Sequence, residues 1–484
     1  MNLSMILDMA ADGQGDRIAI GSRRGGLTYA ELRQAARAGS HALVAGGHDT
    51  LAMAEPSGPV VPVALFAAAW AGASYAPLNY RLPPSTLAEA LGHLPSPLLV
   101  GDENLGGTTA DEWLAKLPAS VDLEESAAGY PEEPDHPAVL LLTSGTSAAP
   151  KTAVLDHDNL LSYIFNTGEF GSAGEDEALL LAVPPFHIAG VAAVLSATWS
   201  GRRIVPLPVF SAEAWIAAAR AEEVTHAFVV PTMLARIVAA LDAGGAGAAP
   251  ALRSLAYGGA RMPAPVLERA LHLFPDTDFA NAYGLTETSS TIAVLGPEDH
   301  RAAITSEDPA VRRRLASVGQ AVPGVDVRIV DSEIQVRGDQ VAGSYLDREG
   351  RVDPDGWLAT GDRGSMDAEG YVFVEGRLDD MIIRGGENIS PAEIEDTILR
   401  HETVATAAVI GLPDEEWGEK IAVAVVAAPG RAIDTEQLCR FVRDQLGSIK
   451  TPSIVEIRLE LPTTPTGKIL RRQLRDELGG GGPA

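Results

Sequence analysis

The sequence predicts an α/β fold with a large N-terminal domain followed by a small α+β domain. Three observations support this prediction. Short apolar runs alternate with helical patterns before residue 319, which is typical of a sheet covered by helices. Short β-branched runs broken by Pro, Gly and Asp then occupy 319–374, and the order helix, strand, strand, helix follows residue 376. The 484 residues therefore divide into two or three lobes.

The first elements alternate helical and extended segments between residues 27 and 98, with helical patterns at 28–43 and 61–71. Three buried strands follow, and each ends in turn residues that precede a helical run. They are predicted at Leu179–Val183, Thr225–Val230 and Ser254–Tyr257. Because ligands bind beyond the carboxyl ends of strands in such sheets, the turns after these strands are candidate site segments.

Residues 319–374 predict a small antiparallel or barrel-like subdomain, with strands at Val325–Val330 and Glu333–Val336. After it, a helix at 391–400, strands at 404–410 and 421–428 and a helix at 435–446 form an α+β pattern. This last segment is long enough to have a core of its own.

The chain carries 37 basic and 65 acidic residues, a formal net charge of -28. This balance argues against general binding to nucleic acids or anionic membranes, because both attract basic surfaces. An anionic substrate would therefore need local positive sites on the protein.

The single cysteine, Cys439, excludes an intramolecular disulfide, and we expect it to be a buried, small apolar residue. The N-terminus lacks a basic segment before an apolar one, so it does not resemble a signal peptide, and we expect a cytoplasmic protein. Residues 60–73 are apolar but short and interrupted by Pro62 and Gly72, which indicates a buried helix rather than a membrane span.

A hydroxyl-rich segment, Thr143–Lys151, follows the apolar run 138–142. Its four hydroxyl side chains and its backbone N–H groups can surround an anion, and Lys151 supplies a positive charge. A P-loop is excluded, because only Gly145 precedes the lysine within the segment. A solvated turn is the alternative, so a phosphate site here depends on what the rest of the chain contains.

Six further segments with candidate site residues follow in order, at 184–187, 257–260, 283–287, 360–362, 376–380 and 465–468. They read Pro-Pro-Phe-His, Tyr-Gly-Gly-Ala, Tyr-Gly-Leu-Thr-Glu, Thr-Gly-Asp, Gly-Arg-Leu-Asp-Asp and Pro-Thr-Gly-Lys. With the hydroxyl-rich segment, they resemble the adenylate-forming superfamily, which includes acyl-CoA synthetases, adenylation domains of peptide synthetases and luciferases. The resemblance spans essentially the whole chain and is greatest to bacterial acyl- or aryl-CoA ligases.

The resemblance implies an N-terminal domain of stacked α/β sheets, residues 1–376, which includes the small barrel-like subdomain. It also implies a hinge at 377–380 and a mobile α+β domain at 381–478. Residues 479–484 are mostly glycine and are expected to form a flexible tail.

Several of these segments have residues suited to a nucleotide. Gly258-Gly259-Ala260 leaves the backbone almost without side chains, so a flat ring can lie on it against Tyr283; a tight turn is the alternative. Asp362 can accept hydrogen bonds from ribose hydroxyls and Arg377 can donate to sugar or phosphate, although an Asp in a turn usually caps it. The resemblance assigns ATP and AMP binding to Thr143, Ser144, Gly145, Thr146, Ser147, Gly258, Gly259, Ala260, Asn281, Tyr283, Gly284, Asp362 and Arg377.

Other residues are suited to catalysis. Glu287 beside Thr286 places a carboxylate next to a hydroxyl, which suits Mg²⁺, whereas a lone Glu in a loop is usually only exposed. The ammonium of Lys468 can meet the charge that builds as pyrophosphate leaves, whereas most lysines near a terminus only aid solubility. His187 resembles a gate at the mouth of an acyl pocket and is otherwise a core histidine. The resemblance implies Thr146 and Glu287 as metal ligands, and catalysis by Lys468, Glu287, Thr286, His187 and Lys151.

These assignments imply a two-step reaction. A carboxylate attacks the α-phosphate of Mg-ATP and releases pyrophosphate, and a thiol then displaces AMP from the acyl adenylate. In the family, the C-terminal domain turns about the position of Asp379 between the steps. A coenzyme A channel is implied for Arg384, Gly385, Gly386, Lys420 and Lys450, with a plain β-turn as the alternative for the glycines.

The acyl pocket is expected to be mostly apolar, and Arg261 is the only arginine adjacent to its segments. A dicarboxylate would require an arginine there, so an aromatic or medium-chain monocarboxylate is favoured. The expected lining is His187, Ile188, Val191, Val230, Met233, Tyr257 and Leu285.

The chain departs from the family pattern at two places. Ala148 and Thr152 stand where the family usually has glycine, so the loop is expected to be stiffer, and ATP affinity is the property that this would change. The stretch Asp331–Glu333 is shortened, which indicates a trimmed surface turn.

Two other functions stay open at this point. The enzyme could pass its activated group to a carrier protein or an amine, or adenylate an inorganic oxyanion such as nitrite. A nucleotide-binding regulatory protein without turnover belongs to a different class, and the intact set of Glu287, Asp362 and Lys468 argues against it. A homodimer is neither required nor excluded.

Overall fold

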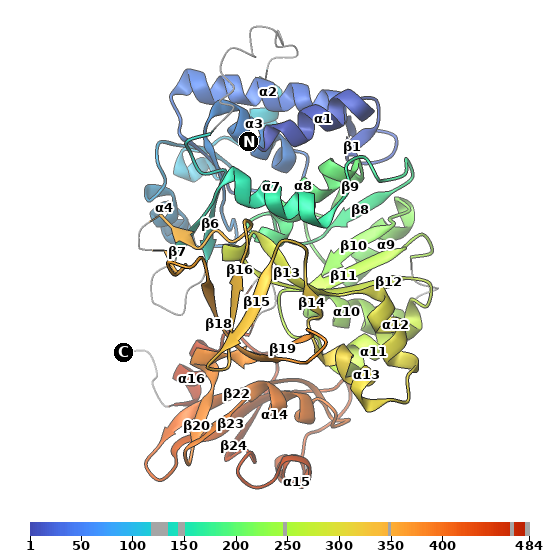
Figure 1. The fold of residues 1–484 in the computed structure, drawn as a ribbon, viewed down its shortest axis with the longest axis vertical. Helices are drawn as coiled ribbons and strands as arrows, with labels where there is room; N and C mark the ends of the chain where they lie inside the picture. The colour runs from blue at the N-terminus through green and yellow to red at the C-terminus, as the bar shows by residue number, and fades with distance from the viewer. Residues whose placement is uncertain (118–133, 144–150, 245–248, 347–349, 465–468, 480–484) are drawn as a thin grey trace.

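The computed structural model spans residues 1–484, and the structure describes all of them except 118–133, 144–150, 245–248, 347–349, 465–468 and 480–484. Three sheets belong to the larger N-terminal part, and a fourth belongs to the smaller C-terminal part that lies below it in Figure 1. Among the helices of the described residues, none is long and apolar enough to cross a membrane. The α/β fold and the order of its parts agree with the prediction.

The nine-stranded sheet, which we call sheet A, contains most of the candidate site segments. Its strand order is β14-β13-β12-β11-β10-β8-β9-β1-β2. Strands β8 to β12 are parallel, and β13 turns back along β12. The bounds are β1 (Ile18–Ile20), β2 (Leu27–Thr28), β8 (Ala178–Leu181), β9 (Arg203–Pro206), β10 (His226–Val229), β11 (Ser254–Gly258), β12 (Asp278–Leu285), β13 (Ser290–Leu295) and β14 (Gln320–Ala321).

Helices cover both faces of sheet A. On one face, Leu180 and Val205 pack in a core around Trp215 of α9, together with α10 and α11. On the other face, Leu181 and Ile204 pack against α8, as expected when successive strand residues point to opposite sides. The helices are α8 (Ile188–Ser200), α9 (Ala212–Ala221), α10 (Pro231–Asp242), α11 (Ala264–Leu273), α12 (Pro297–Thr305) and α13 (Pro309–Arg313), with 3-10 turns η2 (Thr286–Thr288) and η3 (Arg314–Ala316).

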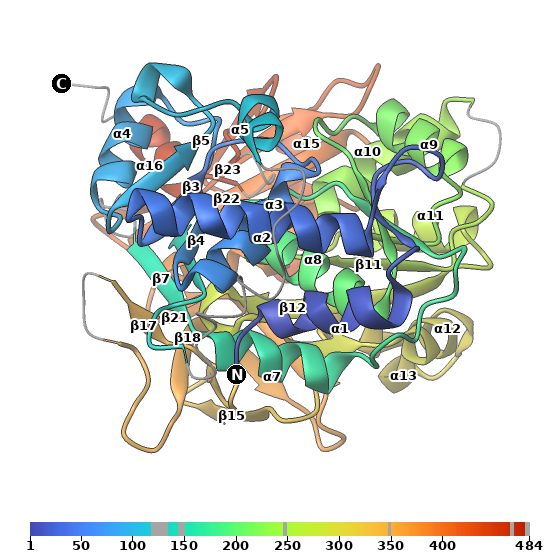
Figure 2. The ribbon, with the colours of Figure 1, turned by 90° about the horizontal axis from the view of Figure 1, so that it is seen from above.

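The six-stranded sheet B has the order β17-β7-β6-β4-β3-β5. One hydrophobic core joins it to sheet A through α3 and α8, which are buried nearly all round, as helices enclosed between two sheets must be. Helices α1 and α2 cover them on the outside (Figure 2). The elements are α1 (Ser4–Gln14), α2 (Tyr29–Gly46), β3 (Thr50–Met53), α3 (Val60–Ala71), β4 (Ser74–Pro77), α4 (Pro84–Gly92), β5 (Pro97–Val100), η1 (Glu103–Leu105), α5 (Ala110–Lys116), β6 (Val139–Thr143), β7 (Lys151–Leu155), α7 (His157–Thr167) and β17 (Ser344–Tyr345).

Sheet C is the small antiparallel subdomain that the sequence predicts. Its order is β15-β16-β18-β19, with β15 (Asp326–Val330), β16 (Glu333–Arg337), β18 (Leu358–Met366) and β19 (Val372–Arg377). The shortened stretch is a two-residue hairpin turn in which Asp331 and Ser332 have φ of 50° and 66°. Positive φ at both positions matches the turn that best joins twisted antiparallel strands, so the stretch is a tight turn, and its shortening relative to the family stays a prediction.

The C-terminal part has its own sheet and core. The sheet contains β20 (Ile382–Arg384), β21 (Glu387–Ile389), β22 (Val404–Asp414), β23 (Gly418–Ala427) and β24 (Ile454–Arg458). Helices α14 (Pro391–Ile398) and α15 (Thr435–Leu446) pack on it, and α16 (Arg471–Leu478) packs against β22. The 3-10 turn η4 (Leu378–Asp380) joins β19 to β20, at the position of the predicted hinge.

One expectation in this part is wrong. Cys439 was expected to be buried, but it is only half-buried, because its position on amphipathic α15 lies beside the buried Leu438 rather than on the core face. Its Sγ lies 3.8 Å from the carbonyl oxygen of Pro452.

Gly319 is expected to be required where sheets A and C meet. Its φ is 84°, a Cβ there would overlap the carbonyl of Val294, and its own carbonyl accepts a hydrogen bond from the Val372 N–H at 2.8 Å. We expect Gly319→Ala to lower the free energy of unfolding by at least about 2 kcal/mol in denaturant titrations. Gly92→Ala is the matched control, because its Cβ meets open space in α4, and it should change stability by less than about 0.5 kcal/mol. Equal losses in both variants would contradict this interpretation.

Candidate active site

A glycine surface lies at the carboxyl ends of β11 and β12. The two strands approach so closely at the pair Gly258 and Ala282 that a Cβ on Gly258 would overlap the Ala282 carbonyl. Gly259 follows with φ of 79°, and Tyr283 lies on the neighbouring strand. Gly258 is buried, whereas Gly259 and Ala260 are exposed, so the backbone predicted to seat a flat ring is open to a ligand from Gly259 onward.

Asp362 is a buried carboxylate, 6% exposed, that binds two partners next to this surface. The Tyr283 hydroxyl donates to Oδ2 at 2.6 Å, and Arg377 Nε lies 3.1 Å from Oδ1. Arg377 is the cross-strand partner of Asp362 and also donates from Nη1 to the Thr360 carbonyl at 2.9 Å. Burial and the Asp362 charge raise the pKa of Tyr283 well above its usual value, so the tyrosine remains a donor.

Glu287 lies in the turn η2 and accepts a hydrogen bond from the Tyr345 hydroxyl at 2.5 Å. The Lys151 ammonium lies 5.9 Å from the centroid of the Tyr345 ring, so a carboxylate, a phenol and a lysine gather here from β7, η2 and β17. Burial and the Glu287 carboxylate raise the pKa of Tyr345 to about 12, while Arg351 beside it opposes the rise. Tyr345 therefore keeps its proton at neutral pH.

The Glu287 turn is held by a buried amide. Gln340 is fully buried, and its Nε2 donates to the carbonyls of Thr288 at 3.0 Å and Thr291 at 2.8 Å. The next residues, Ser289 and Ser290, have φ of 54° and 117°, which L-residues rarely adopt. Strained backbone directly after Glu287 is consistent with a functional constraint at this turn.

A cavity of about 250 Å³ lies between α8 and sheet A. His187 and Ile188 line it from the start of α8, and Val230 and Met233 line it from the start of α10, as predicted. Gly259 and Gly284 line it as well, so one end lies at the glycine surface. Three other residues were expected to line the pocket and do not: Val191, Tyr257 and Leu285. Val191 is buried in the core, and Tyr257 is fully buried with its hydroxyl 2.9 Å from His300 Nε2.

The arginine of the cavity is not the one expected. Arg261 is ion-paired with Asp396 of the C-terminal part, whereas Arg202, which lies after the C-terminus of α8, lines the cavity. The C-terminus of α8 lies next to sheet A, so Arg202 lines the cavity although it is fifteen residues from His187 in the sequence. Tyr163, Ser196, His226 and Ser254 add further polar atoms to the lining.

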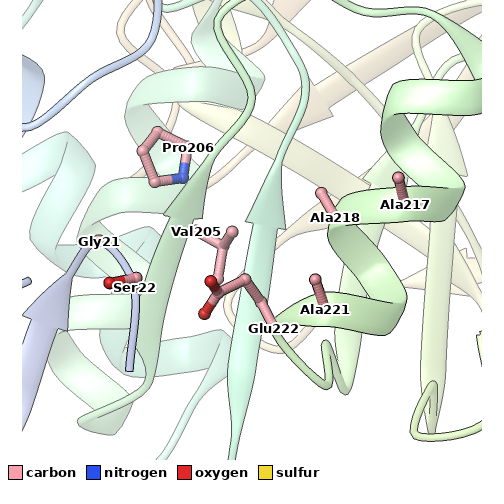
Figure 3. A pocket seen from close by; sticks show the side chains of 8 residues that line it. All are labelled: Gly21, Ser22, Val205, Pro206, Ala217, Ala218, Ala221 and Glu222. Carbon is pink, nitrogen blue, oxygen red and sulfur yellow. The ribbon is translucent and has the colours of Figure 1, made fainter. Parts of the chain in front are cut away.

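A wider depression of about 440 Å³ lies elsewhere on the molecule, between the end of β1 and α9 (Figure 3). Its only charged lining residue, Glu222, accepts a hydrogen bond from Arg203 Nη1 at 2.8 Å and another from the Arg23 N–H at 3.2 Å. The remaining lining residues are small or apolar: Gly21, Ser22, Val205, Pro206, Ala217, Ala218 and Ala221. Without converging polar groups, this depression is not a candidate active site.

Comparison with known proteins shows the family of this chain. The sequence profile described as "AMP-binding enzyme" matches residues 7–346, and that described as "AMP-binding enzyme C-terminal domain" matches residues 393–468. The chain belongs to the AMP-binding enzyme family. The candidate site segments up to Tyr345 lie within the first match.

Relatives of this AMP-binding enzyme match along nearly their whole length. A feruloyl-CoA synthase from Amycolatopsis sp is 35% identical over 94% of this chain and 95% of its own. A fatty acid–[acyl-carrier-protein] ligase from Streptomyces coeruleorubidus is 32% identical over 94% and 92%. The solved structure of o-succinylbenzoate CoA synthetase from Bacillus subtilis with its acyl-adenylate intermediate has a TM-score of 0.82 and 28% identity, and covers 97% of this chain and 98% of that one.

The described residues of this AMP-binding enzyme fit ATP with Mg²⁺. Gly258 has no space for a Cβ beside the Ala282 carbonyl and Gly259 has φ of 79°, so this backbone carries no side chains, and Asp362 offers a fixed carboxylate bonded to the neighbouring Tyr283. No group of three or more His, Cys, Asp or Glu side chains in the described part could hold a metal by itself. A single carboxylate such as Glu287 still suits Mg²⁺, because that ion takes most of its ligands from phosphates and water.

Some predicted residues lie outside the described residues: Ser144, Gly145, Thr146, Ser147, Ala148 and Lys468. Thr143 ends β6 and pairs with Lys151 at the start of β7, so these two flank the hydroxyl-rich loop. Thr152 is buried within β7. Asn281 lies on β12, where its Nδ2 donates to the Ser317 carbonyl at 3.2 Å.

The residues predicted for coenzyme A lie together in the C-terminal part, and two of them make bonds within it. Arg384 Nη1 donates to the carbonyls of Ile449 at 2.9 Å and Thr451 at 3.0 Å, and Lys450 Nζ lies 2.7 Å from both carboxylate oxygens of Glu393. Gly385 and Gly386 form the turn between β20 and β21 with φ of 59° and 83°, and Lys420 lies on β23. Their role in binding coenzyme A stays a prediction.

Sequence reasoning missed three residues of this AMP-binding enzyme: Tyr345, Arg202 and His226. Tyr345 lies in a two-residue strand that pairs with β7, and no local pattern identifies so short a strand. His226 falls inside a predicted buried strand, where a polar residue was a signal that went unused. Arg202 comes close to His226 only in the folded protein, where both contact Glu177.

Replacing Tyr283 by Phe keeps the aromatic face and removes the hydroxyl that donates to Asp362. We expect about tenfold weaker binding of a non-hydrolysable ATP analogue, measured by calorimetry, because hydrogen bonds to charged groups contribute about 1.5–3 kcal/mol. Tyr371→Phe is the matched control, since its hydroxyl donates to Asp299 at 2.6 Å outside the site. An equal loss of affinity in both variants would show that the effect is not local to Asp362.

Proposed function

We propose that this enzyme uses ATP to activate an aromatic or medium-chain monocarboxylic acid as its acyl adenylate, and then forms the thioester with coenzyme A. One observation carries the proposal: Gly259 and Gly284 line the largely apolar cavity and also belong to the segments that form the nucleotide seat. An acid in the cavity would therefore present its carboxylate beside the nucleotide. The feruloyl-CoA synthase and o-succinylbenzoate CoA synthetase relatives support an acid–thiol ligase of the AMP-forming type.

In the first step, a carboxylate oxygen of the acid attacks the α-phosphorus of ATP, and the bond to the pyrophosphate oxygen breaks. Asp362, with Tyr283 and Arg377, would hold the ribose, which fixes the α-phosphate relative to the cavity mouth. Glu287 and Thr146 would hold Mg²⁺, which lowers the charge on the phosphates. Thr286 lies beside Glu287 in the same turn.

Two lysines and a histidine complete the proposed machinery. The hydroxyl-rich loop with Lys151 would hold the departing phosphates, and the Lys468 ammonium would meet the charge that builds at the reacting oxygens. His187 lies at the N-terminus of α8 and lines the cavity, where it would close the mouth against water.

In the second step, the thiol of coenzyme A attacks the acyl carbonyl carbon, and AMP leaves. Rotation of the C-terminal domain about Asp379 would withdraw Lys468 and bring the turn at Gly385 and Gly386 to the site. Arg384, Lys420 and Lys450 are the cations proposed for the phosphates of coenzyme A. Because Lys450 is paired with Glu393, it would have to exchange that carboxylate for a phosphate.

A carrier protein is the second candidate acceptor, and the fatty acid–[acyl-carrier-protein] ligase relative favours it over an amine or an inorganic oxyanion. Pyrophosphate release that coenzyme A does not stimulate would identify such an acceptor. Glu287 and Asp362 are each held by a tyrosine hydroxyl, which argues against a regulatory protein that binds nucleotide but does not catalyse a reaction. A cytoplasmic location remains part of the proposal.

Lys468→Ala is expected to slow pyrophosphate release by at least about a hundredfold, because it removes a charge that acts on the transition state. The assay measures pyrophosphate over a panel of aryl and alkyl acids, each with and without coenzyme A. Lys116→Ala, which removes an exposed lysine on α5, is the control and should match the parent enzyme. If Lys468→Ala adenylates as fast as the parent, the assignment of the first step is wrong.

Asp379→Pro is expected to spare adenylation and to slow thioester formation at least about tenfold. Asp379 lies in the single 3-10 turn η4, and a proline restricts φ there, so the turn resists the change that rotation requires. Pyrophosphate release without coenzyme A and acyl-CoA formation are measured separately. Equal loss of both steps would contradict the hinge.

A further inference from the structure

The end of the cavity remote from the nucleotide carries polar side chains that an alkyl chain would not need. Leu179, His226 and Ser254, at or next to the amino ends of β8, β10 and β11, line this end, whereas Gly259 and Gly284 line the other. A strand rises about 3.3 Å per residue, so the four steps from His226 to Val230 span about 13 Å. The cavity therefore runs along the strands, from the nucleotide seat to a polar end.

Small residues make up two of the walls between these ends, and Phe228, between His226 and Val230 on β10, adds an aromatic ring to the lining. Ala189, Ala192 and Ala193 share one face of α8, since residues three or four apart are neighbours on a helix. Ala256 and Ala282 face them from the sheet. Two opposed rows of methyl groups leave a slot suited to a flat ring, which places an aryl group between the two ends.

At the polar end of the cavity, only Nδ1 of the two His226 ring nitrogens contacts polar atoms of the described residues. Its Nδ1 lies 2.9 Å from Thr225 Oγ1 and 3.7 Å from Glu177 Oε2. The Thr225 hydroxyl already donates to the Ala178 carbonyl at 3.1 Å, so it is an acceptor toward the ring. Both neighbours therefore favour the proton on Nδ1 and leave a lone pair on Nε2, which makes no hydrogen bond with any residue that the structure describes.

Arg202 lies beside His226. Its charge is balanced by Glu177, and one of its N–H groups remains available as a donor. Its Nε and Nη2 both donate to Glu177 Oε2, at 3.0 Å and 2.8 Å, while Nη1 has no partner among the described side chains and carbonyls. Burial and the Arg202 charge lower the pKa of His226 to about 4, so the imidazole is neutral at neutral pH. Arg253 Nη1 also lies 3.8 Å from Glu177 Oε1 and is paired with Asp176 at 2.6 Å, so two arginines face two carboxylates, and this end suits a neutral polar group better than a second carboxylate.

We propose that the acid is a flat aryl acid with a hydroxyl at the end of the ring remote from its carboxylate. His226 Nε2 accepts a hydrogen bond from this hydroxyl, and Arg202 Nη1 donates one to its oxygen. His226 is thus a specificity-determining residue, because an acid without the hydroxyl offers no partner to either polar group at this partly buried end of the cavity. This inference rests on the proposed function, since it concerns the acid of the same reaction.

The test compares cinnamic acid with its para-hydroxy and para-methoxy derivatives, and with octanoic acid, as kcat/KM for pyrophosphate release. We expect the para-hydroxy acid to be favoured over cinnamic acid at least about tenfold, mainly through KM, with the methoxy derivative below the hydroxy acid because it cannot donate. In His226→Leu the preference should fall to about one, while turnover of cinnamic acid persists. His226→Gln, which restores an acceptor, should recover part of the preference.

His272→Leu is the control, because His272 lies on α11 away from the cavity lining. This variant should favour the para-hydroxy acid over cinnamic acid as strongly as the parent enzyme does. Equal kcat/KM for cinnamic and para-hydroxycinnamic acid in the parent enzyme would overturn the inference and leave the proposed function intact, and so would a preference for octanoic acid. Failure of every acid to release pyrophosphate would instead refute the proposed function. The comparison in the parent enzyme decides the matter even if His226→Leu does not fold.

Discussion

A buried carboxylate needs partners, and Asp362 takes them from two different sheets. Tyr283 reaches it from sheet A, while Arg377 binds it from the adjacent strand of sheet C. The ion pair with Arg377 lies within sheet C, so the Tyr283 hydrogen bond, worth about 1.5–3 kcal/mol because its acceptor is charged, is the one that holds the two sheets together at this point. Arg377 directly precedes the turn η4, and its ion pair with Asp362 therefore fixes where the C-terminal part begins.

Close backbone approach is the second condition for the site. Sheet A brings β11 and β12 together at Gly258, and β12 and β13 at Gly284, where any side chain would overlap a carbonyl. These glycines let the strands pair where Gly284 also lines the cavity. The cavity extends from there along α8, and Arg202 and His226 make its far end polar.

Much of this arrangement could be predicted from the sequence, because local patterns carry it. The helix at 435–446 and five strands, β8, β10 and β11 of sheet A and β15 and β16 of sheet C, lie where periodicity and turn residues place them. The glycine and carboxylate segments also lie together, since parallel strands bring their carboxyl ends to one edge. Side chains that depend on long-range packing could not be found this way. Tyr345 reaches Glu287 through a two-residue strand, and Arg202, which follows the C-terminus of α8, has no local pattern that places it beside the cavity.

The central claim is that the cavity and the nucleotide seat are two halves of one site. An aryl acid joined to adenosine through a non-hydrolysable sulfamoyl link carries both halves in one molecule, and calorimetry gives its Kd beside those of AMP and of the free acid. If the halves are contiguous, the joined ligand binds at least about a hundredfold more tightly than AMP, because the second half binds at a high effective concentration. An affinity no greater than that of AMP alone would contradict the claim.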